Sequence, residues 1–283
     1  MSRIAYVEGR YLPHRAAGVH IEDRGYQFAD GVYEVLAVAG GRLIDEAAHL
    51  ARLRRSLGEL QISPPMSDVA LKIVLREVVR RNRVDDGIVY LQVTRGVAPR
   101  EHAFPKAAKP ALVVTSRRRR PADPRLAERG VAVITLPDIR WQRCDIKSTA
   151  LVANVIGKER ARAAGAFEAW QVGRDGFVTE GTSTNAWIVL EDGAVVTRQA
   201  DSAILNGITR LAILEMLGRD GRRLVERPFT VAEAMAAREA FLTSTTAELL
   251  PVVSIDGHQI ADGLPGPVSR RLREFYLAHV ASA

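Results

Sequence analysis

The sequence of 283 residues contains one cysteine, Cys144, so no disulfide can form within the chain. A chain without disulfides is typical of a reducing compartment. No apolar run approaches the roughly 20 residues that a membrane-spanning helix requires, and the N-terminus lacks the apolar stretch of a signal peptide. We therefore expect a cytoplasmic protein that does not associate with membranes.

The motifs of several common site classes are also absent. The six histidines do not pair at the spacing of metal ligands, so we expect no metal site. No phosphate-loop or serine-hydrolase motif is present. The net charge of +7 permits nucleic-acid binding, and the densest basic run covers residues 116–125. No aromatic residues interleave with that run, which favours a solvated linker and no nucleic-acid partner, with a basic nucleic-acid-binding protein as the alternative.

Lysine is scarce, because only five of the 40 lysines and arginines are lysines. One of them, Lys147, lies in the stretch RCDIKSTALV, where Ser148 and Thr149 are typical of a helix start. A positive charge is disfavoured at the N-terminus of a helix, and burial disfavours it further. Both effects favour a neutral amine, the nucleophilic form that Schiff-base chemistry needs. Taken alone, the pattern also fits a lysine whose charged end reaches the surface.

The alternation of short apolar runs with helical patterns predicts an α+β protein of two domains. Residues 1–118 form the expected N-terminal α+β domain, residues 119–125 an interdomain linker, and residues 126–283 a C-terminal α+β domain. Strand pairs are expected around Glu8–Gly9 and Gly40–Gly41. The expected helices cover residues 46–60, 68–82, about 149–165, 207–221, 230–237 and 266–280.

Three further stretches carry groups that could bind a ligand. In VTEGTSTN, Glu180 ends a strand before a turn of hydroxyl residues, and its carboxylate could pair with a protonated ring nitrogen. In NGITR, Gly207 allows close backbone approach, and the helix that begins near Ile208 offers N–H groups to a phosphate. In LTSTTAEL, Ser244 and Thr245 add further donors. Each stretch alone also fits an ordinary turn or helix cap.

Together, a lysine nucleophile, a carboxylate for a pyridinium nitrogen and two phosphate cradles are the parts of a pyridoxal phosphate site. The motifs CDIKS, VTEGTSTN, GITR and FLTSTTAE occur in the order and at the spacing of fold-type IV pyridoxal phosphate enzymes, which the sequence resembles over essentially its full length. That family includes D-amino-acid transaminases, branched-chain aminotransferases and 4-amino-4-deoxychorismate lyases. The resemblance implies a two-domain fold of the D-amino-acid aminotransferase type, with the cofactor between the domains.

The N-terminal half is most similar to the D-amino-acid transaminases. Tyr33 lies in the strand that faces the cofactor in those enzymes. Arg100 and His102, in RGVAPREHAFP, match the pair that binds the substrate α-carboxylate there and comes from the partner subunit of a homodimer. Arginine suits this task because its planar fork binds a carboxylate through two hydrogen bonds. Without the resemblance, the same stretch fits an exposed loop.

The resemblance implies a role for each remaining site residue. Lys147 would carry the cofactor as a Schiff base and transfer a proton between the substrate Cα and the cofactor. Glu180 would keep the ring nitrogen protonated, and Arg140 would lie near the ring oxygen. The residues expected to hold the phosphate or the ring are Arg52, Leu205, Gly207, Ile208, Thr209, Ser244 and Thr245.

The implied reaction transfers the amino group of D-alanine or a similar donor to 2-oxoglutarate, giving D-glutamate and a 2-oxo acid. The alternatives within the fold are a branched-chain L-amino-acid transaminase, an (R)-amine transaminase and 4-amino-4-deoxychorismate lyase. The chain departs from many relatives at Ala150, where they have asparagine, and at Thr182 and Thr184, where serines are common. These departures concern the tuning of the cofactor.

Overall fold

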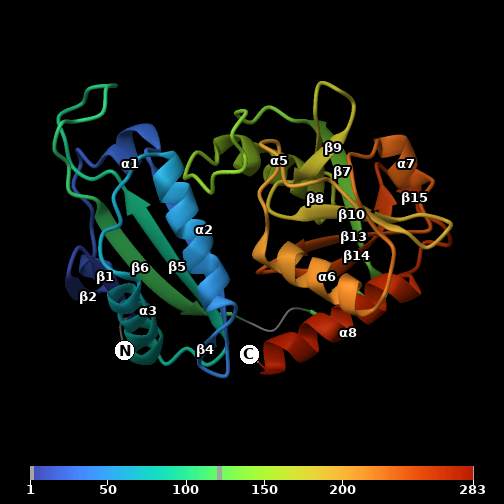
Figure 1. Ribbon diagram of the computed structural model, residues 1–283, viewed down its shortest axis with the longest axis horizontal. Coiled ribbons are helices and arrows are strands. Elements are labelled where there is room, and N and C mark those ends of the chain that lie inside the picture. Colours follow the sequence, from blue (N-terminus) through green and yellow to red (C-terminus); the bar gives the residue numbers. More distant parts are fainter. Residues whose placement is uncertain (1–2, 120–122, 283) are drawn as a thin grey trace. The chain divides into compact units, whose positions relative to one another are not determined.

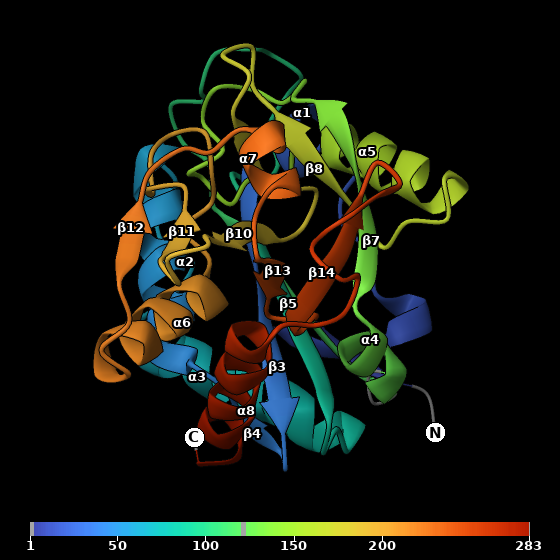
Figure 2. The same ribbon diagram turned by 90° about the vertical axis from the view of Figure 1, so that its right-hand side faces the viewer.

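The computed structural model describes residues 3–119 and 123–282, which form two compact units (Figure 1, Figure 2). The first unit consists of residues 3–119 and 146–150, and the second of residues 123–145 and 151–282. The segment that carries Lys147 therefore packs with the N-terminal unit, although it follows the predicted linker in the sequence. Residues 120–122, within that linker and the basic run, lie outside the described residues.

The first unit contains an antiparallel sheet of six strands in the order β2-β1-β6-β5-β3-β4. The two predicted strand pairs are confirmed: β1 and β2 flank Glu8–Gly9, and β3 and β4 flank Gly40–Gly41. All four turn residues have positive φ, which glycine adopts without a steric penalty. The strands are β1 (Ile4–Val7), β2 (Arg10–Pro13), β3 (Gly31–Ala39), β4 (Arg42–Leu43), β5 (Gly87–Thr94) and β6 (Ala111–Arg118).

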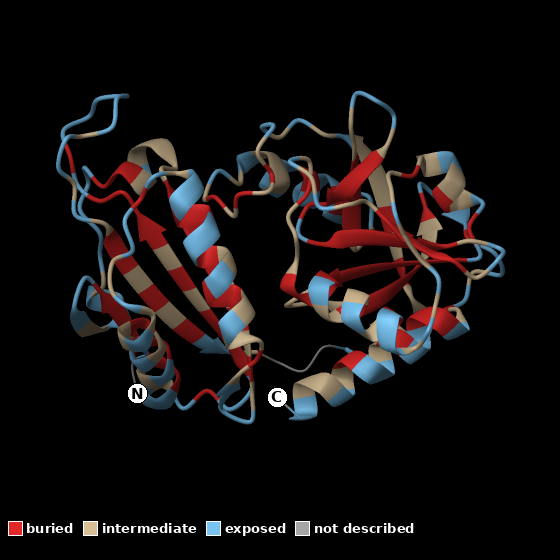
Figure 3. Cartoon of the chain, in the orientation of Figure 1, coloured by how far each residue is buried: buried red, intermediate tan, exposed pale blue. Residues whose placement is uncertain are grey.

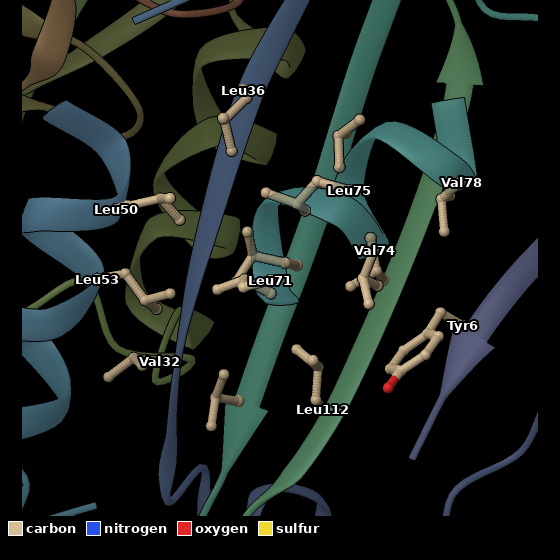
Figure 4. Close-up of a cluster of buried hydrophobic side chains, with 14 of the residues drawn as sticks. Tyr6, Val32, Leu36, Leu50, Leu53, Leu71, Val74, Leu75, Val78 and Leu112 are labelled. Atoms are coloured by element: carbon tan, nitrogen blue, oxygen red, sulfur yellow. The ribbon is translucent and has the colours of Figure 1, made fainter. Parts of the chain in front are cut away.

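Two amphipathic helices cover one face of this sheet (Figure 1). Leu50, Leu53 and Leu57 of α2 are buried in the core cluster of this unit because they follow helical spacing, and Figure 4 shows Leu50 and Leu53 facing the strands. Each buried leucine stabilises the unit by about 1.5–3 kcal/mol. Figure 3 shows the same alternation of buried and exposed positions along helices and strands. The helices are η1 (His14–Ala16), α1 (Arg24–Phe28), α2 (Glu46–Glu59) and α3 (Asp68–Asn82).

The second unit contains a mixed sheet of nine strands in the order β12-β11-β10-β13-β14-β7-β8-β9, with β15 beside β14. The pairs β7–β8, β7–β14 and β11–β12 are parallel and the others are antiparallel. The strands are β7 (Val131–Pro137), β8 (Glu168–Val172), β9 (Val178–Gly181), β10 (Asn185–Val189), β11 (Val195–Thr197), β12 (Leu224–Glu226), β13 (Glu239–Ser244), β14 (Glu248–Ile255) and β15 (His258–Gln259).

Two of the helices of this unit pack against each other and against the sheet. Figure 2 shows α6 beside α8, and Ile213 and Leu217 of α6 share a buried cluster with Leu272 of α8. The predicted cap of α7 is confirmed, because Thr230 and Glu233 each accept a hydrogen bond from the other's backbone N–H. The helices are α4 (Pro124–Arg129), α5 (Val152–Ala163), α6 (Ile208–Arg219), α7 (Val231–Met235) and α8 (Pro267–Ser282).

The apolar stripe of α5 does not face the core of its unit. Val152 and Val155 are 73% and 63% exposed, whereas the buried residues of the helix are Gly157 and Ala161. A helix ordinarily buries such a stripe, so this face of α5 is an exposed apolar surface. Across residues 3–119 and 123–282, no helix has the length and apolarity to cross a membrane, and no three acidic, histidine or cysteine side chains form a metal-binding group.

Candidate active site

Lys147 lies in an extended segment beside the beginning of β3. The amide of Tyr33 donates to the carbonyl of Lys147 at 3.0 Å, Ser148 pairs with Val32, and the amide of Thr149 donates to the carbonyl of Gly31 at 3.0 Å. The segment therefore extends the edge of the sheet by a short antiparallel strip. Its backbone is fixed by these partners.

The helix predicted to start at Ser148 and Thr149 begins at Val152 instead. The amide of Thr149 is taken up by pairing with β3, and its hydroxyl donates to the carbonyl of Ala29 at 3.0 Å. The predicted helix start was therefore wrong. Lys147 therefore does not lie at a helix N-terminus.

Side-chain alternation places Lys147 on the same face of the sheet as Tyr33. Ile146 belongs to the buried cluster under the helices, so the next side chain points to the opposite face. Lys147 Nζ lies 4.2 Å from the centroid of the Tyr33 ring, which stacks on Tyr90 at 5.7 Å. Burial raises the pKa of Tyr90 to about 12, which keeps its hydroxyl protonated. Two predicted site residues, Tyr33 and Lys147, are thus in contact.

Arg52, the predicted phosphate ligand of this unit, is held by Glu34. Its Nε and Nη2 each lie 2.8 Å from a carboxylate oxygen of Glu34, and His49 Nδ1 lies 2.7 Å from the same carboxylate. Burial raises the pKa of Glu34, but the charge and hydrogen bonds of Arg52 outweigh it and hold that pKa at about 2. Burial lowers the pKa of His49, so this histidine is neutral and Glu34 carries the negative charge.

Arg100 and His102 lie in an exposed loop between β5 and β6 and meet at one aromatic side chain. The guanidinium carbon of Arg100 lies 5.1 Å from the centroid of the Phe28 ring, and the His102 ring lies 5.4 Å from it. The structure therefore brings together the two residues predicted to bind a carboxylate. The binding itself stays a prediction.

In the second unit, Glu180 lies in β9, one residue before its end, as a buried carboxylate with several donors around it. Arg140 Nη1 lies 2.5 Å from Glu180 Oε1, while Asn185 Nδ2 and the amide of Leu205 donate to Oε2 at 3.0 and 3.1 Å. These donors stabilise the ionised carboxylate. The predicted residues Arg140, Glu180 and Leu205 are thus in one hydrogen-bonded group.

Arg140 also binds Asp138, through contacts of 3.0 and 2.7 Å. Burial raises the pKa of Asp138, but the hydrogen bonds and charge of Arg140 hold that pKa below its ordinary value. Arg140 is therefore fixed between two carboxylates. Its predicted place near a cofactor oxygen stays a prediction.

The hydroxyl residues after Glu180 serve a protein carboxylate. Thr182 Oγ1 and Ser183 Oγ donate to the fully buried Glu168 at 2.5 and 3.0 Å, and Thr184 Oγ1 does so at 3.4 Å. The sequence indicated that these hydroxyls could face a bound anion or ring. In the structure they fix the turn through Glu168 instead.

The helix start predicted at Gly207 and Ile208 is confirmed, whereas its role in binding a phosphate stays a prediction. Gly207 is the N-cap of α6, and a Cβ atom there would lie 2.2 Å from Asn185 Oδ1, so any side chain at this position would displace Asn185. The first N–H groups of a helix, here those of Ile208 and Thr209, have no acceptor within the helix. The Thr209 hydroxyl, however, lies 3.3 Å from the Tyr276 hydroxyl in the protein interior.

The second cradle lies at the end of β13, close to the first. Asn185, whose side chain abuts Gly207, is paired with Thr243 across the sheet, and Ser244 follows Thr243. Ser244 Oγ accepts a hydrogen bond from the amide of Ala247 at 3.0 Å and so shapes the turn that contains Thr245. The sheet thus gathers the ends of both cradles around Asn185.

Comparison with known proteins decides the family. Residues 31–255 match the family described as amino-transferase class IV. The chain is 43% identical over 266 residues to D-alanine aminotransferase of Bacillus licheniformis, covering 94% of this chain and 93% of that one. It is 40% identical over 279 residues to D-alanine aminotransferase of Staphylococcus haemolyticus, covering 98% of each. The chain belongs to the class IV aminotransferases.

Solved structures of class IV aminotransferases share the fold. The branched-chain amino acid aminotransferase of Escherichia coli superposes with a TM-score of 0.90 at 21% identity, covering 98% of this chain and 94% of that one. A hypothetical aminotransferase of Mycobacterium tuberculosis gives a TM-score of 0.84 at 22% identity, covering 99% of each chain. The predicted α+β fold is therefore confirmed.

Three residues that no motif predicted hold the predicted site residues within each unit. Glu34 holds Arg52, Glu168 holds the turn after Glu180, and Asn185 joins Glu180 to Gly207. For Glu34, the sequence pattern held a signal that could have identified it. Glu34 occupies a core-facing position of β3, and a charge there requires a buried partner.

Proposed function

We propose that the chain is a pyridoxal-phosphate-dependent aminotransferase that transfers the amino group of D-alanine, or a similar D-amino acid, to 2-oxoglutarate. The products are D-glutamate and a 2-oxo acid. The chain is identical to D-alanine aminotransferases at about two fifths of its positions over nearly its full length, and this similarity carries the proposal. The joint placement of Arg100 and His102 on Phe28 supports it.

The residues present fit the cofactor chemically. Bound pyridoxal phosphate supplies a carbonyl carbon that joins an amine and a ring that accepts electrons. The chain offers the amine of Lys147, whose backbone is fixed by hydrogen bonds to β3, and the carboxylate of Glu180, which is surrounded by hydrogen-bond donors. It also offers the first N–H groups of α6 beside Gly207, where a side chain would displace Asn185. The residues that would hold the phosphate and the ring are Arg52, Arg140, Leu205, Gly207, Ile208, Thr209, Ser244 and Thr245.

Each reacting group of the chain then has one task. Lys147 Nζ would hold the cofactor in the resting enzyme and would take the proton from the substrate Cα once it is released. Glu180, kept ionised by its donors, would keep the ring nitrogen protonated. Tyr33, Arg100 and His102 would bind and orient the substrate carboxylate.

We further propose a homodimer in which Arg100 and His102 serve the site of the other subunit. Arg100 and His102 are both exposed in the single chain. An arginine that binds a substrate carboxylate must face an active site, and the second subunit would supply that site. The exposed apolar stripe of α5, with Val152 and Val155, offers surface that a second subunit would cover. We also propose a cytoplasmic location, since the single cysteine permits no internal disulfide.

The deciding experiment is a coupled assay of the cofactor-loaded enzyme with D-alanine and L-alanine in parallel, with 2-oxoglutarate as the acceptor. We expect pyruvate from D-alanine and D-glutamate as the second product. If D-alanine is not a substrate, turnover of branched-chain L-amino acids, turnover of (R)-amines lacking a carboxylate, or pyruvate release from aminodeoxychorismate would assign one of the other activities of the fold and overturn the proposal.

A further inference from the structure

Two buried arginines meet at one carboxylate behind the loop that carries Arg100 and His102. Arg24 Nε and Arg95 Nε lie 2.8 and 2.7 Å from Asp30 Oδ2, and Arg95 Nη2 lies 3.0 Å from Asp30 Oδ1. The side chains of Arg24 and Arg95 are 3% and 8% exposed. Three charge-assisted contacts to one largely buried carboxylate hold both guanidinium groups in place.

Asp30 remains ionised in this position. Burial raises the pKa of its carboxyl group, but hydrogen bonds from Arg95 and Arg24 and their charges bring that pKa below the ordinary value. The group therefore contains two positive charges and one negative charge. Removing Asp30 would leave two buried arginines without this counter-ion, and removing either arginine would leave Asp30 with only the other.

The far ends of the two arginines reach the loop. Arg24 Nη1 donates to the carbonyl of Glu101 at 2.5 Å, and Nη2 donates to the carbonyl of His102 at 3.4 Å. The guanidinium carbon of Arg95 lies 3.6 Å from the centroid of the Phe104 ring. Side chains from inside the unit thus fix the backbone of an exposed loop that has no regular secondary structure.

Phe28 links this group to the two proposed carboxylate ligands. The guanidinium carbon of Arg24 lies 4.8 Å from the centroid of the Phe28 ring, on which Arg100 and His102 also rest. Arg24 therefore contacts the backbone of the loop and the ring that supports its functional side chains. A shift of Arg24 would move both.

We propose that Asp30, acting through Arg24 and Arg95, positions the loop that presents Arg100 and His102 to the substrate carboxylate. This inference rests on the proposed function, in which Arg100 and His102 bind that carboxylate. Asp30, Arg24 and Arg95 are positioning residues, since their contacts are with the loop and with Phe28. Their loss should weaken carboxylate binding without slowing the chemistry of bound substrate.

The test uses Arg24→Met in the cofactor-loaded enzyme, because methionine keeps an unbranched side chain but removes the charge and all donors. We expect KM for D-alanine, and the inhibition constant of propionate as its carboxylate fragment, to rise about tenfold or more, as for a lost charge-assisted hydrogen bond. We expect kcat within about threefold of the parent and an unchanged absorbance of the bound cofactor. If Arg24→Met does not fold, Arg24→Lys keeps the contact with Asp30 but cannot fork to both carbonyls, and the same split is expected.

Arg118→Met is the matched control. Arg118 also donates to a backbone carbonyl, that of Arg83, through Nε and Nη2 at 3.0 and 2.8 Å, but at the end of β6. Its replacement should leave KM and the propionate constant unchanged. An equal rise in KM for Arg118→Met and Arg24→Met would show a general loss of structure and overturn the inference.

The double variant Arg24→Met/Arg100→Ala separates this inference from the proposed function. If Arg24 acts through the loop, the double variant should have the KM of Arg100→Ala alone, because two substitutions that remove the same interaction do not have additive effects. If Arg100→Ala raises KM but Arg24→Met does not, or lowers kcat instead, the inference fails and the proposed function stands. If Arg100→Ala itself leaves KM unchanged, the carboxylate role of the loop fails and the inference fails with it.

Discussion

Replacing Glu34 with glutamine tests how the first unit fixes Arg52. The carboxylate of Glu34 accepts hydrogen bonds from Arg52 Nε and Nη2 and contacts His49 Nδ1, all within 2.8 Å. Glutamine has one acceptor oxygen and would turn a donor toward one of these groups. The guanidinium of Arg52, 9% exposed, would keep its charge and lose the carboxylate of Glu34 as a counter-ion.

The free energy of unfolding that Glu34→Gln should lose follows both from the broken ion pair and from the lowered pKa of Glu34. Breaking a buried ion pair on one side costs about 3–5 kcal/mol. The pKa of Glu34 falls from an ordinary 4.5 to about 2, and a fall of that size corresponds to stabilisation on the order of 3 kcal/mol. Because the folded-state pKa is lowered, this stability is present above the ordinary pKa and is lost as the pH falls toward about 2. Neutral His49 acts in the same direction, since its pKa is also lowered and the unfolded chain binds the proton first.

The assay is urea unfolding of the cofactor-saturated enzyme at pH 7 and at steps down to pH 4. Glu77→Gln is the matched control, because hydrogen bonds from Arg80 and Arg81 also hold the pKa of Glu77 at about 2, but at the protein surface. Water screens a surface pair, so Glu77→Gln should change stability far less. Glu34→Gln should be destabilised at pH 7 by about 3 kcal/mol and should lose less stability on acidification than the parent. Equal effects of the two substitutions would refute the role assigned to burial.

Two further substitutions have defined outcomes. Arg100→Ala should raise KM for D-alanine by about tenfold to a hundredfold while leaving turnover of an amine without a carboxylate unchanged, because one charged hydrogen-bonding group is lost; equal effects on both substrates would exclude carboxylate binding. Gly207→Ala should displace Asn185 from Glu180, weaken cofactor binding in a fluorescence titration and destabilise the fold by about 1–3 kcal/mol. Gly218→Ala, in the same helix with open space at its Cβ, should be neutral or slightly stabilising, and a similar loss of cofactor in both variants would contradict the argument.

The fold was predictable where the pattern is local. The helical patterns at α2 and α3 and the glycine turns of the first sheet predicted elements that the structure confirms. The start of α5 was not predictable in this way, because Ser148 and Thr149 pair with β3, more than a hundred residues earlier in the chain. The helix α4 was also missed, although Asp123 caps it and Pro124 occupies its first turn.

The site shows the same division between local and distant information. Reactive side chains such as Lys147 and Glu180 could be chosen from motifs, whereas the groups that hold them depend on tertiary contacts. No motif in the sequence marks Asp30 or Glu168. Their burial beside arginines or hydroxyl groups follows only from the packing of separate elements.

The most direct test of the central claim is to find the lysine that carries the cofactor. Borohydride reduction of the purified enzyme should attach pyridoxal phosphate to Lys147, so that trypsin leaves residues 144–158 as one labelled peptide instead of cutting after Lys147. Lys147→Arg should abolish the label and the D-alanine activity, while Lys158→Arg, at a surface lysine, should keep both. A label on another lysine, or full D-alanine activity in Lys147→Arg, would contradict the account.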